Sequence, residues 1–196
     1  MPESNRFAHP VTVEADRLSY EPFKERGQVV RFSCGQSDLD ESLDSTEVEE
    51  YERENLGRTT LAFYDGQLVG YYAISSDGLR LEYIQARKYP KSHVKKGKEL
   101  VETVPSIKIG RLAVEQAHQC RGFGRLFIRR IAAIGLSGDS AVRLPIVNSK
   151  STSVNFYLSC GFKLTREVGH ERGRTERTMY LDLLGVEKEI FTSDRA

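Results

Sequence analysis

One stretch of this 196-residue chain limits its fold more than any other: an apolar run, a loop with two glycines and an amphipathic run follow one another directly. Residues 106–114 are rich in isoleucine, leucine and valine, which predicts a mostly buried strand. Gly122 and Gly124 stand in the loop, and from Leu126 to Ile134 apolar residues recur at helical spacing. The stretch therefore predicts a strand, a glycine-bearing turn and a helix.

The loop ahead of this predicted helix has the properties of an anion site. The first amides of a helix lack partners within it, the helix dipole favours negative charge there, and glycine lets an anion approach the backbone. We therefore expect residues 119–125 to hold a phosphate, although the same spacing also fits a plain tight turn. The Gly-x-Gly-x-x-Gly fingerprint of dinucleotide folds and the Gly-Lys-Ser/Thr ending of a P-loop do not occur here.

The first half of the chain predicts one helix and one hairpin. Ser37, followed by acidic residues, is typical of a helix start, and Gly57 is a suitable end. Two strand-like runs, 59–64 and 67–75, are joined by Asp65-Gly66, a pair that supplies the positive φ angles of a tight hairpin turn. Asp77-Gly78 predicts a second turn.

The second half of the chain alternates between strand and helix signals. Residues 85–98 are polar and basic and are interpreted as a long loop. Beyond the central helix we expect a strand over 141–147, a short helix over 151–159, and closing strands over 162–168 and 178–183. This alternation predicts an α/β fold with a mixed sheet.

The composition is that of a globular protein. Apolar residues make up 39% and charged residues 29% of the chain, values that exclude global disorder. The chain has no apolar run of the roughly 18 residues that a membrane span needs, and its first residues lack the apolar stretch of a secretory signal. We expect a cytoplasmic protein with a flexible lead-in over 1–10, one domain over 11–185 and a tail over 186–196.

Three cysteines, Cys34, Cys120 and Cys160, form an odd set without paired metal-ligand spacing. Reduced thiols and no bound metal are therefore expected. Each cysteine adjoins or lies near a glycine, which invites a catalytic interpretation, but free cysteine usually behaves as a small buried hydrophobe. Packing is the preferred interpretation.

Taken together, three motifs resemble the GNAT superfamily of N-acetyltransferases. Gln119-x-x-Gly122-x-Gly124 is similar to the family's pyrophosphate loop, Arg111-Leu-Ala-Val114 precedes it, and 156–162, Phe-Tyr-Leu-Ser-Cys-Gly-Phe, follows. The resemblance spans roughly 59–183 and implies a splayed mixed sheet of about six to seven strands flanked by helices. Phe32-Ser-Cys-Gly35 and Leu39-Asp40 further resemble the branch that includes tRNA-acetylating toxins of toxin–antitoxin pairs.

The resemblance implies an acetyl-CoA site between Arg111 and Arg125 that Tyr157 completes. Leu112, Ala113 and Val114 would pair through their backbones with the pantetheine arm, and Phe156 would pack inward. The pyrophosphate would be wrapped by the amides of Gln119, Cys120, Arg121, Gly122, Phe123, Gly124 and Arg125. Tyr157 would place its hydroxyl near the thioester sulfur, although a core aromatic is the plainer interpretation of the same residue.

The transfer chemistry asks for positioning and polarisation. A neutral amine attacks the thioester, backbone amides near Val114 stabilise the oxyanion, and Tyr157 protonates the departing thiolate. A general base is not evident, since an exposed loop role is the preferred interpretation of the candidates by residue type, which are Glu82, Glu102, Glu115 and His93.

Two positions depart from what a strand or the family would require. Pro145 lies inside a predicted strand and cannot donate to a sheet ladder, which is tolerable near the gap where the family's sheet splays. Lys150 stands where many relatives carry a cofactor-contacting Asn, and Asn148 is the candidate that would compensate.

Charge is unevenly distributed along the chain, which bears on partners. Acidic residues crowd 38–54, whereas one loop carries basic residues without an acid, namely Arg87, Lys88, Lys91, Lys95, Lys96 and Lys98. Such a loop can grip a phosphate backbone or simply be solvated. Aminoacyl-tRNA is the first acceptor hypothesis, with a small ribbon-helix-helix antitoxin as partner. A small-molecule or protein amine, a non-catalytic acyl-CoA-binding module and a homodimer stay open, and no membrane partner is expected.

Overall fold

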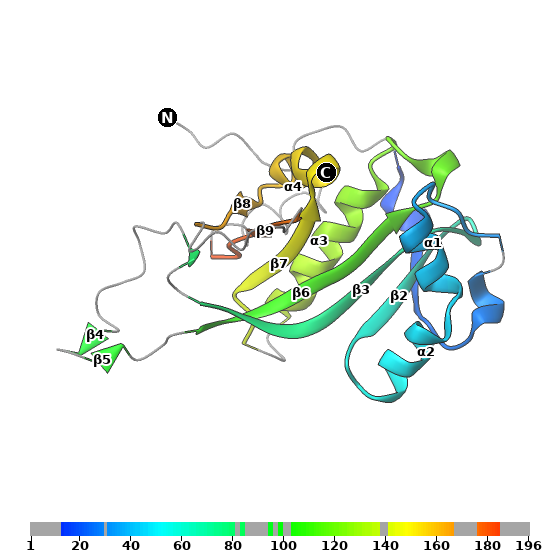
Figure 1. The fold of residues 1–196 in the computed structure, drawn as a ribbon. Coiled ribbons are helices and arrows are strands. Elements are labelled where there is room, and N and C mark those ends of the chain that lie inside the picture. The colour runs from blue at the N-terminus through cyan, green and yellow to red at the C-terminus, as the bar shows by residue number, and fades with distance from the viewer. Residues whose placement is uncertain are drawn as a thin grey trace. The chain divides into compact units, whose positions relative to one another are not determined.

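The computed structural model describes residues 13–29, 31–80, 83–84, 94–95, 98–99, 103–137, 141–166 and 176–184. The chain divides into two compact units, one of residues 1–75 with 109–131 and one of residues 76–108 with 132–196. Figure 1 shows the course of the chain, and three elements run through both units: β3 (Gln67–Arg80), β6 (Thr103–Val114) and α3 (Phe123–Leu136).

The first unit contains the predicted hairpin. β1 (Leu18–Pro22) pairs antiparallel with β2 (Arg58–Tyr64), which pairs antiparallel with β3, and β6 follows in the order β1-β2-β3-β6. The turn residues Asp65 and Gly66 have φ angles of 52° and 77°, as a tight hairpin turn requires. The hairpin prediction is confirmed, with a register shift between Ala62 and Phe63.

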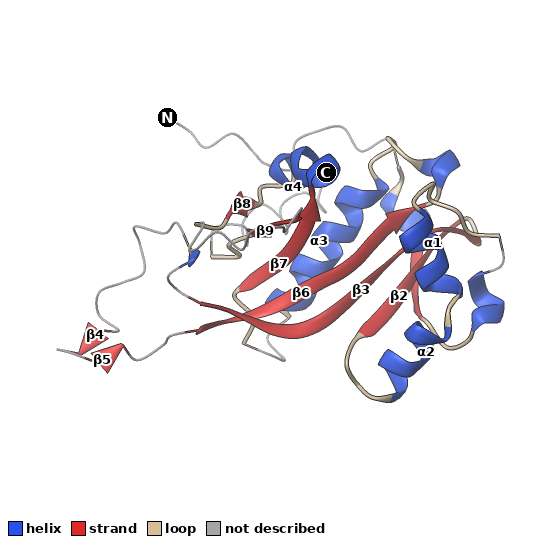
Figure 2. Cartoon of the chain, in the orientation of Figure 1, coloured by secondary structure: helices blue, strands red, loops and turns tan. Residues whose placement is uncertain are grey.

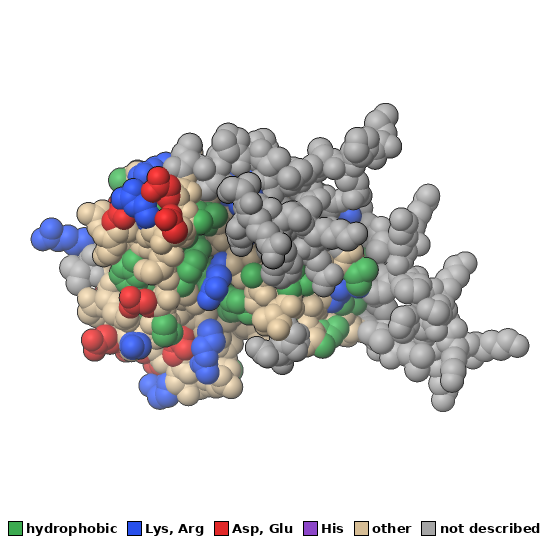
Figure 3. All heavy atoms as spheres, turned by 180° about the vertical axis from the view of Figure 1, so that it is seen from behind, with side chains coloured by type: hydrophobic (Ala, Val, Ile, Leu, Met, Phe, Trp, Pro, Cys, Tyr) green, Lys and Arg blue, Asp and Glu red, His purple; other side chains and the backbone are tan. Residues whose placement is uncertain are grey.

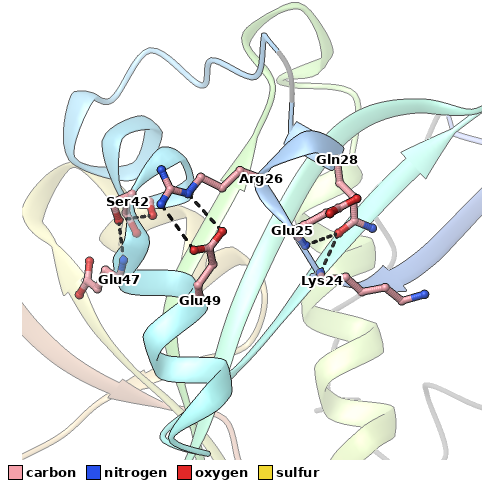
Figure 4. A network of polar contacts seen from close by, with 8 residues as sticks. Lys24, Glu25, Arg26, Gln28, Ser42, Glu47 and Glu49 are labelled. Carbon is pink, nitrogen blue, oxygen red and sulfur yellow. Dashed lines mark hydrogen bonds and ion pairs between the residues drawn. The ribbon is translucent and has the colours of Figure 1, made fainter.

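The helix predicted from Ser37 to Gly57 is wrong in one respect, because the structure contains two helices, α1 (Ser37–Asp44) and α2 (Thr46–Arg53). Ser45 lies between them with extended backbone and acts as the N-cap of α2. Its hydroxyl accepts from Glu47 N at 3.3 Å and donates to Ser42 O at 2.8 Å. Figure 4 labels the two partner residues, Ser42 and Glu47. A serine that bonds neighbouring backbone groups in this way competes with helix continuation.

The start of α2 is also tied to η2, a short 3₁₀ helix (Arg26–Val29), by a side-chain contact. Arg26 Nε donates to Glu49 Oε1 at 3.2 Å, and Figure 4 shows the two side chains facing one another. The pair is largely exposed and contributes about 0–1 kcal/mol. Burial of apolar side chains beneath α1 and α2 is therefore the stronger tie.

Neighbouring residues of β3 serve the two faces of the sheet in the first unit. Tyr71 is buried with Leu43 of α1 and Val48 of α2, and its hydroxyl donates to Leu39 O at 2.7 Å. Tyr72 contacts Phe127 of α3, with ring centroids 6.2 Å apart. Because successive strand residues point to opposite faces, α1 and α2 cover one face and α3 the other, and Figure 2 shows α1 and α2 together on one side of the strands.

The second unit has the strand order β3-β6-β7-β9-β8. Its strands β7 (Leu144–Lys150), β8 (Lys163–Leu164) and β9 (Glu176–Tyr180) pair antiparallel, with Ile146 opposite Tyr180. After β7 come η6 (Ser151–Ser153) and α4 (Val154–Ser159), as the sequence predicts.

Two polar features close the second unit. Arg143 Nε donates to Asp182 Oδ1 at 2.7 Å, which holds the residues just after β9 beside those just before β7. Pro145 lies at the second position of β7, where its carbonyl accepts from Leu181 N at 2.9 Å. Pro145 thus takes part in the hydrogen bonding through its carbonyl, and the N–H that proline lacks is tolerated near the start of a strand.

The turn predicted at Asp77-Gly78 is wrong, because β3 continues through both residues to Arg80. A Cβ at Gly78 would lie 2.4 Å from Thr103 Cγ2 of β6. The glycine therefore permits a close approach to β6 in the second unit and does not reverse the chain.

The predicted α/β class is confirmed. The strand order, in which neighbours are hydrogen-bonded, is β1-β2-β3-β6-β7-β9-β8, and β3 and β6 have residues in both units. A separate two-stranded ladder joins β4 (Val94–Lys95) and β5 (Lys98–Glu99) within the long loop that the sequence predicts. The described helices are all too short or too polar to cross a membrane.

Candidate active site

The loop between β6 and α3 turns on two residues with left-handed backbone. After β6 the chain forms the short 3₁₀ helix η5 (Gln116–His118), and α3 begins at Phe123. Cys120 has a φ of 59° and Gly122 a φ of 103°. A side chain is strained at the second of these positions, so the turn requires the glycine that the sequence places there.

Few amides of this loop bond to backbone carbonyls. Arg125 N donates to Gly122 O at 3.0 Å, and Gln119 N makes a long bond of 3.4 Å to Gln116 O. Within the described part of the chain, no carbonyl accepts from the amides of Cys120, Gly122, Phe123 or Gly124. These amides stand at the N-terminus of a 14-residue helix, where the backbone favours an anion.

Contacts around Glu115 hold the first part of the loop. Its carboxylate accepts from Ala117 N at 3.0 Å and lies 2.8 Å from His118 Nδ1. The His118 ring meets the Phe123 ring edge-on, with 5.8 Å between centroids, and the guanidinium of Arg121 lies 5.6 Å from the centroid of the Phe123 ring. Glu115, a candidate base by residue type, is thus engaged in shaping the turn, whereas Glu82, His93 and Glu102 lie outside the described residues.

The end of β6 offers backbone groups on one side. Glu115 N donates to Val69 O of β3 at 2.8 Å. Since backbone groups alternate in direction along a strand, those of Ala113 also point toward β3, and those of Leu112 and Val114 point away from it. Of the three residues predicted to pair with pantetheine, Leu112 and Val114 therefore have the outward backbone, although Val114 O already accepts from Gln119 Nε2 at 3.1 Å.

Tyr157 lies in the second unit, on α4, and is 7% exposed. Its ring lies edge-on between Phe156 and Phe162, with centroid separations of 5.0 and 5.2 Å. Burial, with a smaller effect of Cys160, raises the pKa of Tyr157 above its ordinary value, so its phenol is protonated at neutral pH. Phe156, which the sequence placed inward, is half-buried, and Tyr157 is the more enclosed of the two.

Asn148 also lies in the second unit, exposed on β7. Its Oδ1 accepts from Thr178 Oγ1 of β9 at 3.0 Å, which fixes the orientation of the amide and directs its NH₂ group elsewhere. Lys150 is exposed two residues further along the same strand.

The cysteines differ in exposure. Cys34 and Cys160 are buried, and Cys120 is exposed in the loop. Burial raises the pKa of Cys34 to about 11, so this thiol stays protonated and is a poor nucleophile at neutral pH. Packing is the role that the structure gives these two buried side chains.

The predicted basic loop is described only in part. Arg87, Lys88, Lys91 and Lys96 lie outside the described residues, and Lys95 and Lys98 are described as backbone in β4 and β5. On the face drawn in Figure 3, the coloured basic and acidic side chains lie among one another. The described part of that face therefore carries charge of both signs.

Comparison with protein families gives one match. Residues 28–162 match the model of the acetyltransferase (GNAT) family. This segment contains the β6–α3 loop, Asn148 and Tyr157. No curated protein matches the chain by sequence.

Several solved structures share the fold. A tyrosine-to-phenylalanine mutant of KacT is 18% identical with a TM-score of 0.71, covering 88% of this chain and 98% of its own. AtaT complexed with acetyl-methionyl-tRNAfMet is 21% identical with a TM-score of 0.68, covering 87% and 98%. AtaTR bound with AcCoA is 22% identical with a TM-score of 0.64, covering 88% and 98%. At these identities the likeness is one of fold.

Proposed function

The chain belongs to the acetyltransferase (GNAT) family, and from this premise we propose that it binds acetyl-CoA along 112–125 and transfers the acetyl group to the amine of an aminoacyl-tRNA. One observation carries the proposal: no carbonyl of the described residues accepts from the amides of Cys120, Gly122, Phe123 and Gly124, which lie at and just before the start of α3. Main-chain donors of this kind suit a diphosphate, because they add hydrogen bonds to a favourable helix dipole.

The cosubstrate supplies an activated acyl group, and the residues of the loop fit its nucleotide half. Gly122 has no Cβ that would keep a phosphate from the backbone, and Phe123 begins α3 with its side chain fully buried. The outward backbone of Leu112 and Val114 would pair with the amide-bearing pantetheine arm as a further strand would. The AcCoA-bound structure of AtaTR supports acetyl-CoA as the cosubstrate.

Two groups of this chain would perform the acyl transfer. The Val114 amide would donate to the oxyanion that develops when the amine nitrogen bonds to the acyl carbon. Tyr157 would donate a hydrogen bond to the sulfur as the carbon–sulfur bond breaks. A phenol, with an ordinary pKa of about 10, is already a weaker acid than a thiol, whose pKa is about 8.5, and burial raises the pKa of Tyr157 further. Tyr157 would therefore not give up its own proton to the thiolate, in contrast to the expectation from the sequence. The proton that finally neutralises the sulfur is therefore the one the attacking amine loses.

The acceptor assignment depends on two observations of different kinds. The motif from Phe32 to Asp40 resembles the tRNA-acetylating branch, and the solved structures of shared fold include AtaT with acetyl-methionyl-tRNAfMet. We propose that the basic loop binds the phosphate backbone of the tRNA. Its basic residues are Arg87, Lys88, Lys91, Lys95, Lys96 and Lys98.

A small antitoxin is the proposed protein partner. AtaT has been solved with the C-terminus of the antitoxin AtaR, and KacTA has been solved as a DNA complex. The acidic residues of 38–54 would then face a basic segment of such a partner. The test is whether an adjacent reading frame encodes a small DNA-binding protein and, if so, whether that protein copurifies with this chain on co-expression.

The decisive experiment has two stages. Calorimetry with acetyl-CoA tests the site, and absence of any heat of binding would overturn the proposed function at its root. A thiol-release assay then compares charged tRNAs with the same tRNAs uncharged, with polyamines and with peptides. Release with charged tRNA alone supports the acceptor assignment, whereas release with polyamines or peptides alone would contradict it and retain the acetyltransferase.

A further inference from the structure

A short segment of the first unit, Ser33–Gln36, is bonded on both sides, and we refer to it as the strap. On one side lies α1, and on the other lies the loop between β6 and α3. The strap precedes α1 directly in the chain, but its contact with the loop through Cys34 and Gln119 joins residues 85 positions apart. Such contacts exist only in the folded protein.

Asp40 of α1 holds the strap through its carboxylate. One oxygen accepts from Cys34 N at 2.7 Å and the other from Ser33 Oγ at 2.9 Å. Asp40 N in turn donates to Gln36 O at 3.0 Å. Burial would raise the pKa of Asp40, but the hydrogen bonds from Cys34 and Ser33 outweigh it and lower the pKa, so the side chain is an anion at neutral pH.

The loop receives the other side of the strap. Ser33 O accepts from Gln116 N at 2.9 Å, and Cys34 O accepts from Gln119 Nε2 at 2.8 Å. The same Gln119 Nε2 also donates to Val114 O at 3.1 Å. One side-chain amide therefore ties the strap, the end of β6 and the start of the loop.

We propose that Asp40 is a positioning residue for acetyl-CoA binding: by holding the strap, it fixes the Gln119 side chain and with it the backbone of the loop. The inference rests on the proposed function, because it assigns Asp40 to the acetyl-CoA site. Asp40 itself touches the strap and does not belong to the loop. Its carboxylate acts on the site through two successive pairs of hydrogen bonds.

The physical reason is preorganisation of the loop. The loop contains two left-handed residues, Cys120 and Gly122, and several amides without carbonyl partners, a conformation that a free chain rarely adopts. An anchored loop loses less conformational freedom on binding, so its affinity for the diphosphate is higher. Charge-assisted bonds such as those of Asp40 are the stronger kind of anchor.

The test compares Asp40→Asn with Glu41→Gln. Both remove one negative charge from α1, but Glu41 is exposed and, among the described contacts, only the Asp40 carboxylate bonds to the strap. We expect the calorimetric Kd of acetyl-CoA to rise about tenfold in Asp40→Asn, since hydrogen bonds to a charged group are lost, and to change little in Glu41→Gln. In the same variant, hydrogen exchange at the amides of 119–125 should accelerate, while exchange across β7 and β9 stays as in the wild type.

Each outcome decides between two statements. Wild-type protein without affinity for acetyl-CoA would overturn the proposed function and this role with it. Wild-type affinity in Asp40→Asn, or faster exchange in α1 alone, would overturn the positioning role and leave the proposed function standing. Ser33→Ala removes only the Ser33 Oγ bond and serves if Asp40→Asn does not fold. For it we expect the Kd to rise about threefold to fivefold, less than in Asp40→Asn because the carboxylate keeps its bond from Cys34 N. An unchanged Kd with unchanged exchange would count against the role.

Discussion

The loop before α3 and the Tyr157 site use different parts of the polypeptide. The loop presents main-chain amides, and what matters there is the backbone path set by Cys120 and Gly122. The Tyr157 site presents one side-chain hydroxyl, held by aromatic neighbours in a buried position. A backbone site tolerates many side chains but few backbone changes, and a side-chain site has the opposite sensitivity.

The difference also separates two functional quantities. In the proposed function the loop contributes to binding of acetyl-CoA, whereas Tyr157 contributes to the breaking of the carbon–sulfur bond. Variants of the loop should therefore change Kd, and variants of Tyr157 should change kcat.

Tyr157→Phe is expected to have the largest effect. Loss of the hydroxyl should lower kcat by about tenfold to a hundredfold, as expected when one hydrogen bond to the developing thiolate is lost, with the Kd of acetyl-CoA unchanged because the ring still fills its place. Tyr20→Phe is the matched control, since Tyr20 also lies among aromatic rings and burial likewise raises its pKa. An unchanged kcat in Tyr157→Phe would contradict the assignment of this residue.

The pH profile is expected to show the next largest effect. Measured with a hydrolysis-resistant aminoacyl analogue, kcat/KM should rise about tenfold per pH unit below the pKa of the attacking amine and then stay level to about pH 10. The level region follows from burial, which raises the pKa of Tyr157 and keeps the phenol protonated. A descending limb near pH 8 to 9 that vanishes in Tyr157→Phe would show instead that the phenol titrates there.

Gly122→Ala should weaken binding without a comparable change in kcat. Alanine is strained at a φ of 103°, and a cost of about 1–2 kcal/mol in backbone energy corresponds to a roughly tenfold higher Kd for acetyl-CoA if the loop shifts to relieve it. Gly66→Ala places the same substitution at a φ of 77° in the hairpin turn. Both variants should lose thermal stability. An equal loss of acetyl-CoA affinity in both would show that the loss comes from general destabilisation and not from the loop before α3.

Cys120→Ala should have the smallest effect. The Cys120 side chain is exposed, and the loop is proposed to act through its amides, so the Kd of acetyl-CoA should change by no more than about twofold. Calorimetry on the same protein preparations provides the measurement. A tenfold loss of affinity for acetyl-CoA would mean that the thiol itself contacts the ligand and that the loop does not bind through main-chain groups alone.

Local structure in this chain was predictable where short-range signals are strong. The Asp65-Gly66 hairpin, the helix after Gly122 and the short helix over 151–159 all occur as expected. Two predictions were wrong, one for a local and one for a tertiary reason. Ser45 interrupts the predicted long helix by bonding to neighbouring backbone groups, and Gly78 lies in a strand because β6 comes too close for a side chain.

The candidate site was predictable in its motifs and less so in its contacts. Residue spacing indicated the phosphate loop, because glycines ahead of a helix are visible in the sequence, and the role of Tyr157 was a prediction from the resemblance to the family. The bonds from Asp40 to the strap and from Gln119 to Cys34 were not foreseen. The neighbouring motif from Phe32 to Asp40 was the only available signal, and it carried no indication of its partner.

The sequence alone determined the family, through the match of residues 28–162 to the family model. It also determined the strand–loop–helix order, because that order depends on periodicity and on glycine, which act over a few residues. Tertiary structure decided which loop amides lack a carbonyl partner among the described residues, how far Tyr157 is buried and what Asp40 supports. Those properties arise from groups far apart in the chain, and their energies depend on distances and on removal from water that exist only once the chain is folded.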